Sequence, residues 1–150
     1  MGAVGLRGAR DSDVVAIEAL LKTEMLPAME IQEWLSTFWV LEKDGGLVGC
    51  AGTERYGEAI VLRSVAVDPS LRGTGEGERL VGHVLNDARQ GGAKRAYLFT
   101  GSAAGFFTRF GFERCELTDF EAAARESWQW RGVSSQESLK AFITPMRANL

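Results

Sequence analysis

The sequence predicts an α/β protein in which helices and strands alternate around one core. Amphipathic segments with helical period alternate with short apolar segments that are typical of strands. Residues 44–46 (Asp-Gly-Gly) predict a hairpin turn, and the near-continuous apolar run over 59–67 predicts a strand that is covered on both faces. A chain of 150 residues is the length of one ordinary domain, so we expect a single domain over 1–150.

The elements are expected in the order β-α-α-β-β-β-α-β-α-β, followed by a tail. A strand over 4–8 precedes a helix from Val14, for which residues 11–13 offer N-cap side chains. The other expected elements are a short helix over 28–35, strands over 38–42, 47–55, 59–67 and 95–100, a helix from Glu78 to Gly91, a short helix over 103–109, a strand over 112–117, a helix over 119–126 and a final strand over 139–145. Residues 127–138 fit either class.

Composition places the chain among globular proteins and excludes several classes of function. The net charge is -3 and no long basic run occurs, so nucleic acid is not an expected partner. The apolar runs are too short to span a bilayer, and the N-terminus lacks the apolar stretch of a signal peptide. Cys50 and Cys115 lack the spacing of metal ligands or of a redox pair, and we expect buried thiols. These features predict a cytoplasmic protein without a metal site or membrane contact, and they leave a homodimer open.

A glycine-rich loop over 72–77 joins the apolar strand to the helix that follows it. Glycines at 73, 75 and 77 let backbone N–H groups crowd around an anion, and a helix N-terminus adds unpaired N–H donors and a positive dipole end. Arg72 supplies a positive charge at the rim. The loop therefore predicts a site for a phosphate or pyrophosphate.

Two common nucleotide-binding motifs do not fit this loop. A P-loop requires a lysine directly after its glycines, and none follows here. The dinucleotide-binding pattern G-x-G-x-x-G has Glu78 in place of its third glycine, and Tyr97 stands where its acidic residue is expected.

The pattern Arg72-x-x-Gly75-x-Gly77, preceded by V-A-V-D-P over 65–69, resembles the coenzyme A loop of the GNAT acetyltransferase superfamily. Residues 97–100 resemble that family's fifth strand, and F-F-x-R-x-G-F over 106–112 resembles its next helix and strand start. The resemblance covers most of residues 4–117 in the family's element order. It implies the GNAT fold, which is a central, mostly antiparallel sheet with a splayed strand pair and helices on both faces.

The resemblance also implies an N-acetyltransferase that uses acetyl-CoA as co-substrate and transfers the acetyl group directly to a small-molecule amine. The backbone of Val65, Ala66 and Val67 would hold the pantetheine arm, with the N–H of Val65 as the oxyanion donor to the thioester carbonyl. The other residues that the resemblance assigns to the cofactor are Arg72, Gly73, Thr74, Gly75, Glu76, Gly77, Thr100 and Phe107.

Three of these positions depart from the family pattern. Glu76 replaces an aliphatic residue, and a carboxylate beside a pyrophosphate weakens binding unless it points into solvent or onto Arg79. Phe107 stands where many members have the tyrosine that protonates the departing thiolate, and Thr100 replaces a frequent asparagine. The enzyme then either uses another proton donor, for which Ser102 and Tyr56 are candidates, or lets the thiolate leave unassisted.

The resemblance also implies a bulge in the strand over 59–67, which splays it from the next strand, and Arg63 interrupts the apolar run one residue before that bulge. Its guanidinium either pairs with Glu54 or Glu58, or grips a carboxylate of the acceptor with a bidentate fork. The segments L-R-S-V-A-V over 62–67, G-L-V-G-C-A-G over 46–52 and T-x-x-A-x-x-F-F over 100–107 are together similar to arsenic-resistance N-acetyltransferases and to short N-acetylglutamate synthases, which implies an amino-acid-like acceptor. Glu54 and Glu58 are also the candidate general bases, with surface strand residues as the alternative interpretation.

Two other functions stay open at this point. Glu76 and Phe107 are compatible with a non-catalytic acetyl-CoA-binding sensor or regulatory module, and acetylation of proteins is a lesser alternative. His83, the only histidine, is expected on the solvated side of its helix. The four tryptophans are expected in or beside the core rather than in a substrate cage.

Overall fold

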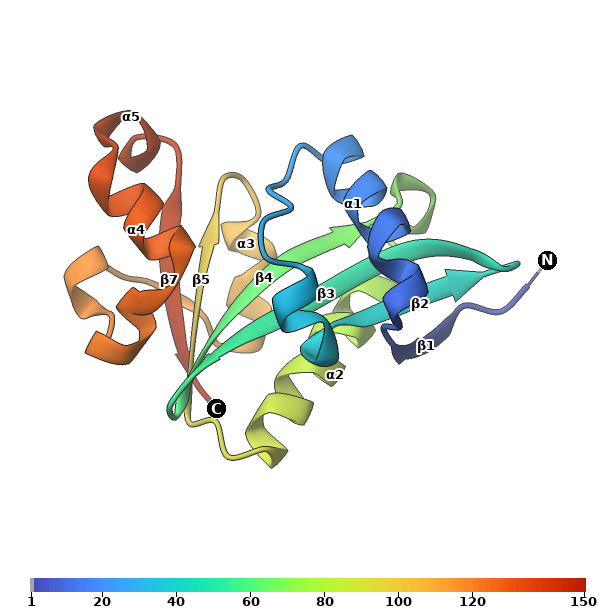
Figure 1. Cartoon of the computed structure of the whole chain (residues 1–150), viewed down its shortest axis with the longest axis horizontal. Helices are drawn as coiled ribbons and strands as arrows, with labels where there is room; N and C mark the ends of the chain where they lie inside the picture. Colours follow the sequence, from blue (N-terminus) through green and yellow to red (C-terminus); the bar gives the residue numbers. More distant parts are fainter. Residues whose placement is uncertain (1) are drawn as a thin grey trace. The chain divides into compact units, whose positions relative to one another are not determined.

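The computed structural model describes residues 2–150 (Figure 1). Its strands are β1 (Gly5–Gly8), β2 (Trp39–Lys43), β3 (Gly46–Tyr56), β4 (Ala59–Val67), β5 (Arg95–Thr100), β6 (Glu113–Arg114) and β7 (Thr144–Asn149). Its helices are α1 (Val14–Thr23), α2 (Glu76–Gln90), α3 (Ala104–Phe107), α4 (Trp128–Ser135) and α5 (Glu137–Lys140). The strand order over the described residues is β1-β2-β3-β4-β5-β7-β6. The β4–β5 pair is parallel, and the sheet is otherwise mostly antiparallel, as the sequence predicts.

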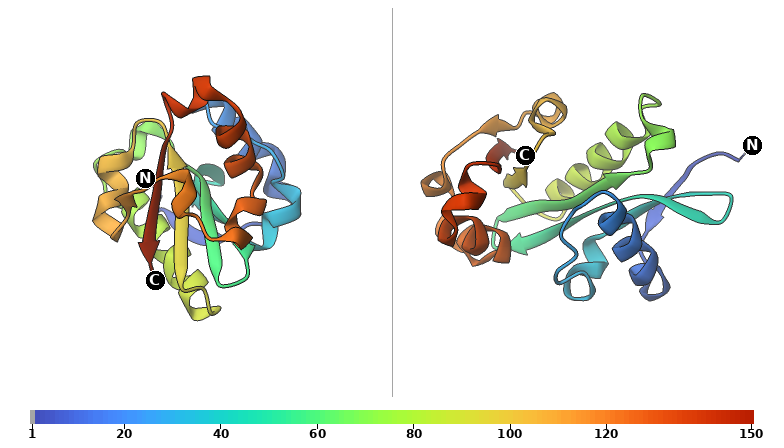
Figure 2. Two further views of the ribbon diagram at one scale, coloured as in Figure 1. Left: turned by 90° about the vertical axis from the view of Figure 1, so that its left-hand side faces the viewer. Right: turned by 90° about the horizontal axis from the view of Figure 1, so that it is seen from above.

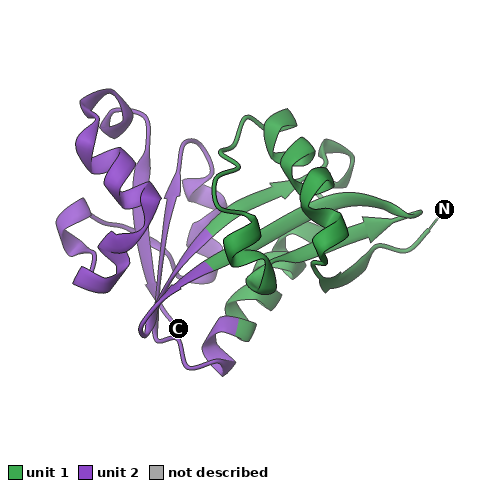
Figure 3. Cartoon of the chain, in the orientation of Figure 1, with its two compact units in different colours: residues 1–53, 63–87 green, residues 54–62, 88–150 purple. Residues whose placement is uncertain are grey.

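The chain divides into two compact units, shown in different colours in Figure 3. Unit 1 comprises residues 1–53 and 63–87, and unit 2 comprises residues 54–62 and 88–150. Strands β3 and β4 and helix α2 contribute residues to both units. The single domain expected from the length of the chain stays a prediction.

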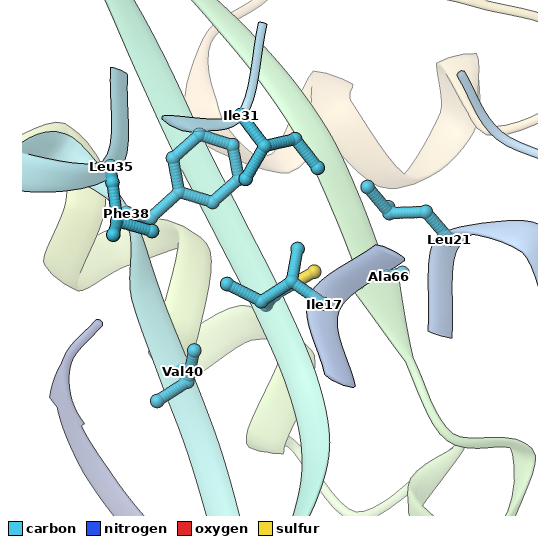
Figure 4. Packing of buried hydrophobic residues seen from close by; sticks show 8 residues of the cluster. Ile17, Leu21, Ile31, Leu35, Phe38, Val40 and Ala66 are labelled. Atoms are coloured by element: carbon cyan, nitrogen blue, oxygen red, sulfur yellow. The ribbon is translucent and has the colours of Figure 1, made fainter. Parts of the chain in front are cut away.

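Unit 1 has helices on both faces of its strands. Figure 2 shows α1 and the 3₁₀ helix Gln32–Thr37 on one face, and α2 on the other. The turn between β2 and β3 forms as predicted, with φ of 52° at Asp44 and 77° at Gly45. The core on the α1 side is drawn in Figure 4 and consists of Ile17, Leu21, Ile31, Leu35, Phe38, Val40, Cys50 and Ala66.

Unit 2 is built around β5. The start of β4 pairs with it in parallel from Ala59↔Arg95 to Val61↔Tyr97, and β7 pairs with it along its whole length in the antiparallel sense. The rings of Tyr97 and Phe120 stack with their centroids 4.3 Å apart. Beside them the carboxylate of Glu121 accepts hydrogen bonds from Arg95 and from the Tyr97 hydroxyl, and the Arg95 guanidinium lowers the pKa of that carboxyl. These contacts hold the segment after β6 against the sheet.

Several predicted elements of the C-terminal third are wrong. The strand expected over 112–117 is only Glu113–Arg114, and the helix expected over 119–126 is replaced by two 3₁₀ helices, Leu117–Asp119 and Ala122–Glu126. The final strand starts at Thr144 instead of residue 139. The reason is the spacing of Leu139, Phe142 and Ile143, which is helical: the N–H groups of both later residues donate to the Leu139 carbonyl.

Two predictions in the N-terminal part also need correction. The short helix expected over 28–35 begins four residues later, as Gln32–Thr37. Asp13 does not cap α1 with its side chain. Its carboxylate instead accepts hydrogen bonds from the Arg10 N–H (2.7 Å) and from the Arg7 guanidinium (2.7 and 2.9 Å). None of the helices within residues 2–150 is both long enough and apolar enough to traverse a membrane.

The core of unit 1 requires a glycine at position 52. A Cβ there would lie 2.3 Å from the Phe38 ring, which is itself buried. We therefore expect Gly52→Ala to lower the free energy of unfolding by about 1–3 kcal/mol, because the ring has no room to move. Gly105→Ala is the control, because a Cβ at Gly105 meets nothing within 4 Å. Urea denaturation of both variants measures the difference, and equal midpoints would contradict the packing described here.

Candidate active site

The last part of β4 contains an irregular residue, Ser64. Its φ is 55°, a left-handed conformation that non-glycine residues adopt rarely and almost never inside a strand. The carbonyl of Ser64 accepts a hydrogen bond from the Cys50 thiol at 3.3 Å. Burial raises the pKa of that thiol to about 12, so it remains protonated and able to donate at neutral pH. The backbone of β4 is therefore irregular at Ser64, the position at which the bulge is expected.

The residues after Ser64 lead from the core to the glycine loop. Ala66 is buried against the α1 side of unit 1, while Val65 and Val67 on either side of it are half-buried. Because neighbouring side chains in a strand point to opposite faces, Val65 and Val67 face away from the Ala66 core. Asp68 then accepts a hydrogen bond from the Ser70 N–H at 2.9 Å, and the chain turns away from the sheet.

The loop over 72–77 lies between two buried leucines, Leu71 and Leu80, and is itself mostly exposed. Gly73 and Gly75 have φ of 80° and 86°, which explains why both positions carry glycine. Helix α2 starts at Glu76, immediately after the second of these glycines. The loop therefore ends at the N-terminus of a 15-residue helix, as the sequence predicts.

The backbone of the loop offers free hydrogen-bond donors. The N–H of Thr74 donates to the Leu71 carbonyl. Within residues 2–150, by contrast, the N–H groups of Gly73, Gly75 and Gly77 have no acceptor. Donors of this kind at the positive end of a helix dipole bind anions, and phosphate most of all. These donors are of the kind that suits a phosphate or pyrophosphate.

The charged side chains of the loop are paired with one another or with neighbouring elements. The carboxylate of Glu76 accepts two hydrogen bonds from Arg79, at 2.7 and 2.9 Å. This is the arrangement onto Arg79 that the sequence left open, and it neutralises the negative charge closest to the loop. Arg72 forms an ion pair of 3.0 Å with Glu24 at the end of α1. Sequence reasoning missed this pair.

Arg63 is buried within unit 1, with 3% of its surface exposed. Its Nε donates to the Ser64 hydroxyl at 3.0 Å, and its Nη2 donates to the Met29 carbonyl. The guanidinium carbon lies 5.5 Å from the centre of the Phe38 ring, within the range of a cation–π contact. The side chain that was expected to recognise a carboxylate thus has a neutral carbonyl as one of its partners.

The two candidate bases, Glu54 and Glu58, both belong to unit 2 and differ strongly. Glu54 is fully buried and accepts hydrogen bonds from the hydroxyls of Tyr56 (2.8 Å) and Ser127 (3.0 Å) and from the indole N–H of Trp128 (2.9 Å). Glu58 is largely exposed and forms ion pairs with Lys94 and Arg95. Glu54 is therefore not the surface strand residue of the alternative interpretation, and both its oxygens are engaged.

The remaining predicted residues also have structural partners. In unit 2, the Thr100 hydroxyl accepts a hydrogen bond from the Ala103 N–H at 3.0 Å, and Phe107 is buried with its ring edge-on to Phe106 and Phe112. In unit 1, the prediction of a solvated His83 is wrong, because its ring packs edge-on against Trp39 at 4.2 Å. Unit 1 brings together residues 63–67 and 72–77, whereas Glu54, Glu58, Thr100 and Phe107 belong to unit 2.

The buried Glu54 network has a measurable consequence for stability. Glu54→Gln places an amide NH2 where the carboxylate now accepts hydrogen bonds, and the indole N–H of Trp128 cannot become an acceptor. We expect a loss of about 1–3 kcal/mol in the free energy of unfolding, whereas Glu58→Gln should cost less than about 1 kcal/mol because its ion pairs are exposed. Urea unfolding of the two variants separates these cases. A Glu54→Gln protein as stable as Glu58→Gln would show that the network contributes nothing.

Comparison with known proteins agrees with this geometry. Residues 34–114 match the family model described as the acetyltransferase (GNAT) domain. The chain is 33% identical over 127 residues to an amino-acid acetyltransferase of Mycobacterium tuberculosis, covering 78% of this chain and 72% of the relative. It is 29% identical over 141 residues to an amino-acid acetyltransferase of Neisseria meningitidis, covering 88% of this chain but only 32% of the relative. The chain therefore spans about a third of the length of the Neisseria relative.

Solved structures with the same fold include two with a bound coenzyme. Rv2747 from Mycobacterium tuberculosis, solved in complex with CoA, superposes with a TM-score of 0.80 at 28% identity over 97% of this chain and 99% of that one. N-acetylglutamate synthase from Neisseria gonorrhoeae, solved with CoA and N-acetyl-glutamate, gives a TM-score of 0.79 at 24% identity over 100% of this chain and 36% of that one. The second likeness shows the fold alone. From the family match over residues 34–114 and the similarity to Mycobacterium tuberculosis amino-acid acetyltransferase, this chain belongs to the GNAT acetyltransferase family.

Proposed function

We propose that the protein is an acetyl-CoA-dependent N-acetyltransferase whose acceptor is the primary amine of a small, amino-acid-like molecule. The observation that carries this proposal is the loop over 72–77, where three unpaired N–H groups and two left-handed glycines stand at the N-terminus of α2. The relatives named amino-acid acetyltransferase support the acceptor class, and the neighbours solved with CoA support the co-substrate. A cytoplasmic location and a homodimer stay predictions from composition.

The cofactor is assigned to the loop and to the end of β4. The N–H groups of Gly73, Gly75 and Gly77 would bind the pyrophosphate, and Arg72 would add a positive charge at the rim. The backbone over 65–67 would hold the pantetheine arm beside the bulge at Ser64. Because Arg79 neutralises Glu76, one of the two grounds for a non-catalytic sensor is removed.

The reaction then needs no covalent enzyme intermediate. The neutral amine nitrogen attacks the thioester carbonyl carbon, a C–N bond forms, and the C–S bond breaks. The amine loses one proton, and the departing thiolate takes up one to become the CoA thiol. The N–H of Val65 would stabilise the oxyanion that develops between these events, an interaction commonly worth about 3 kcal/mol. The protein's main task is to hold the amine nitrogen in the orientation from which it can attack the thioester carbonyl carbon.

The acceptor is assigned to Arg63. In the free protein one N–H of its guanidinium is satisfied by the neutral carbonyl of Met29. A carboxylate forms a stronger, charge-assisted hydrogen bond with a guanidinium than a carbonyl does. An amino-acid carboxylate would therefore replace the Met29 carbonyl, and the fork of Arg63 would fix its orientation.

The cofactor assignment is tested at Gly75. A valine at this position would be forced into a left-handed conformation, although a Cβ there meets nothing within 4 Å, so we expect the fold to survive while the loop changes shape. Calorimetry should show acetyl-CoA affinity reduced at least about tenfold, the effect of losing 1.4 kcal/mol of binding free energy. Gly45→Val, which has similar strain in the β2–β3 turn, is the control and should bind normally. Native affinity in Gly75→Val would remove the loop from the site.

The acceptor assignment is tested with L-glutamate and its α-amide as probes. Arg63→Lys retains the charge but not the bidentate fork, so the KM for L-glutamate should rise about tenfold while kcat changes less, as for an interaction made in ground and transition states alike. The α-amide should be a poor substrate for the native enzyme and should lose little more in the variant. The KM for acetyl-CoA should not change. If the KM for L-glutamate stays at the native value, Arg63 has a structural role only.

A further inference from the structure

Residues 24–30, which we call the strap, connect α1 to the 3₁₀ helix Gln32–Thr37 within unit 1. The core holds the chain on both sides of it, through Leu21 before and Ile31 after, both buried. The strap itself is exposed at Met25 (91%) and Met29 (55%). After Leu26, whose N–H donates to the Leu21 carbonyl, residues 28–30 make no backbone hydrogen bond through their N–H groups within the described part of the chain. The backbone ladder of unit 1 therefore holds the strap only at its start.

Two arginines from other elements of unit 1 form hydrogen bonds with the strap. The carboxylate of Glu24 binds the guanidinium of Arg72 at 3.0 Å, and the carbonyl of Met29 accepts a hydrogen bond from Arg63. These are the two arginines that the proposed function assigns to the two substrates, Arg72 to acetyl-CoA and Arg63 to the acceptor carboxylate. Each fastening thus occupies a group that an anionic substrate would need.

The Glu24–Arg72 pair is unequal in its exposure. The side chain of Arg72 is 68% exposed and that of Glu24 only 18%. The arginine is therefore the partner with room to turn, and a phosphate at the loop would draw it away from Glu24. The Nη2 of Arg72 donates to Glu24 in the free protein, so a phosphate that draws the guanidinium toward the loop weakens this hydrogen bond, and the two anions compete for the same side chain.

We propose that Glu24 sets the affinity of the loop for acetyl-CoA, by competing with the phosphates for Arg72, and that cofactor binding releases the first end of the strap. This inference rests on the proposed cofactor site. Cofactor binding at the loop would in this way loosen the strap, and the strap also contains Met29, whose carbonyl accepts a hydrogen bond from Arg63. Glu24 acts through Arg72 and is an affinity-determining residue that does not itself touch the reacting atoms.

The competition is tested by calorimetry with acetyl-CoA on Glu24→Gln. Removing the competing charge should lower the Kd about two- to fivefold, the size expected for an ion pair near the protein surface, and the gain should shrink in high salt. Glu18→Gln is the matched control, because Glu18 is an exposed glutamate of α1, the helix that the strap follows, and its replacement changes the net charge equally. An equal gain in Glu18→Gln, or none in Glu24→Gln, overturns the proposal.

A double-mutant cycle isolates the pair. In the Arg72→Gln background the two anions have nothing to compete for, so Glu24→Gln should no longer change the Kd for acetyl-CoA. A gain that persists without Arg72 would mean that Glu24 acts by general repulsion of the phosphates, and the proposal would be wrong.

Release of the strap is tested by hydrogen exchange of the amides of Glu24, Met25 and Leu26, whose N–H groups donate to backbone carbonyls of α1. Exchange should be faster in Glu24→Gln than in Glu18→Gln without any ligand, and acetyl-CoA should produce the same acceleration in the native protein. Unchanged exchange in Glu24→Gln overturns the proposal even if acetyl-CoA binds. Faster exchange in Glu24→Gln in a protein that does not bind acetyl-CoA overturns the proposed function and the competition, while leaving the Glu24 fastening established.

Discussion

The left-handed backbone of Ser64 is held in place from three directions within unit 1. The Cys50 thiol donates to its carbonyl, the Arg63 guanidinium donates to its hydroxyl, and Ala66 two residues later is fixed in the core. A non-glycine residue in this conformation costs about 1–2 kcal/mol, so it persists only where its surroundings enforce it. This constraint interrupts the regular pleat of β4 just before residues 65–67 and the glycine loop. The assignments made to the backbone of Val65 and to the loop all depend on it.

The charges around the candidate site follow one pattern. Arg72 is paired with Glu24, Arg79 with Glu76, and Arg63 donates to the Met29 carbonyl. In a chain of net charge -3, no excess of basic residues draws anionic substrates to the protein. In the proposed function, recognition of phosphate and carboxylate would depend on exchanging one partner of an arginine for a better one, which is a smaller free-energy change than filling an empty positive pocket. The backbone N–H groups of the loop differ in this respect, because they have no partner to give up.

Local features of the fold could be predicted from the sequence and long-range ones could not. The turn at 44–46, strand β4 and the glycine loop are encoded by residues next to one another, and each formed where it was predicted. Helix α2 begins at Glu76, two residues before the predicted start, because the turn of the loop already continues into it. The final strand was predicted to start too early, at residue 139. The Leu139 carbonyl accepts hydrogen bonds from Phe142 and Ile143 in a helical turn, and apolar composition alone does not distinguish this turn from a paired strand.

The candidate site shows the same division. The positions of Arg72 and the three loop glycines follow from the motif, whereas Glu24 is 48 residues away from Arg72 and no sequence spacing links them. Ser127 and Trp128 donate to the Glu54 carboxylate but are 73 and 74 residues away from it in the sequence. From the sequence alone, Glu54 could therefore be interpreted as a surface strand residue. The partner of Arg63 at Met29 is a backbone carbonyl, which every residue has and no residue type identifies. Such contacts become visible only when the chain has folded.

The central claim is that the N–H groups of the glycine loop hold the pyrophosphate of acetyl-CoA. It is tested most directly by following the backbone amide resonances of ¹⁵N-labelled protein during titration with acetyl-CoA, and separately with the short thioester S-acetyl-N-acetylcysteamine, which has no pyrophosphate. We expect the amides of Gly73, Gly75 and Gly77 to shift strongly and saturably with acetyl-CoA, and to stay unchanged with the short thioester. Saturable binding of acetyl-CoA that leaves these three amides unshifted, or equal shifts with both compounds, would contradict the account.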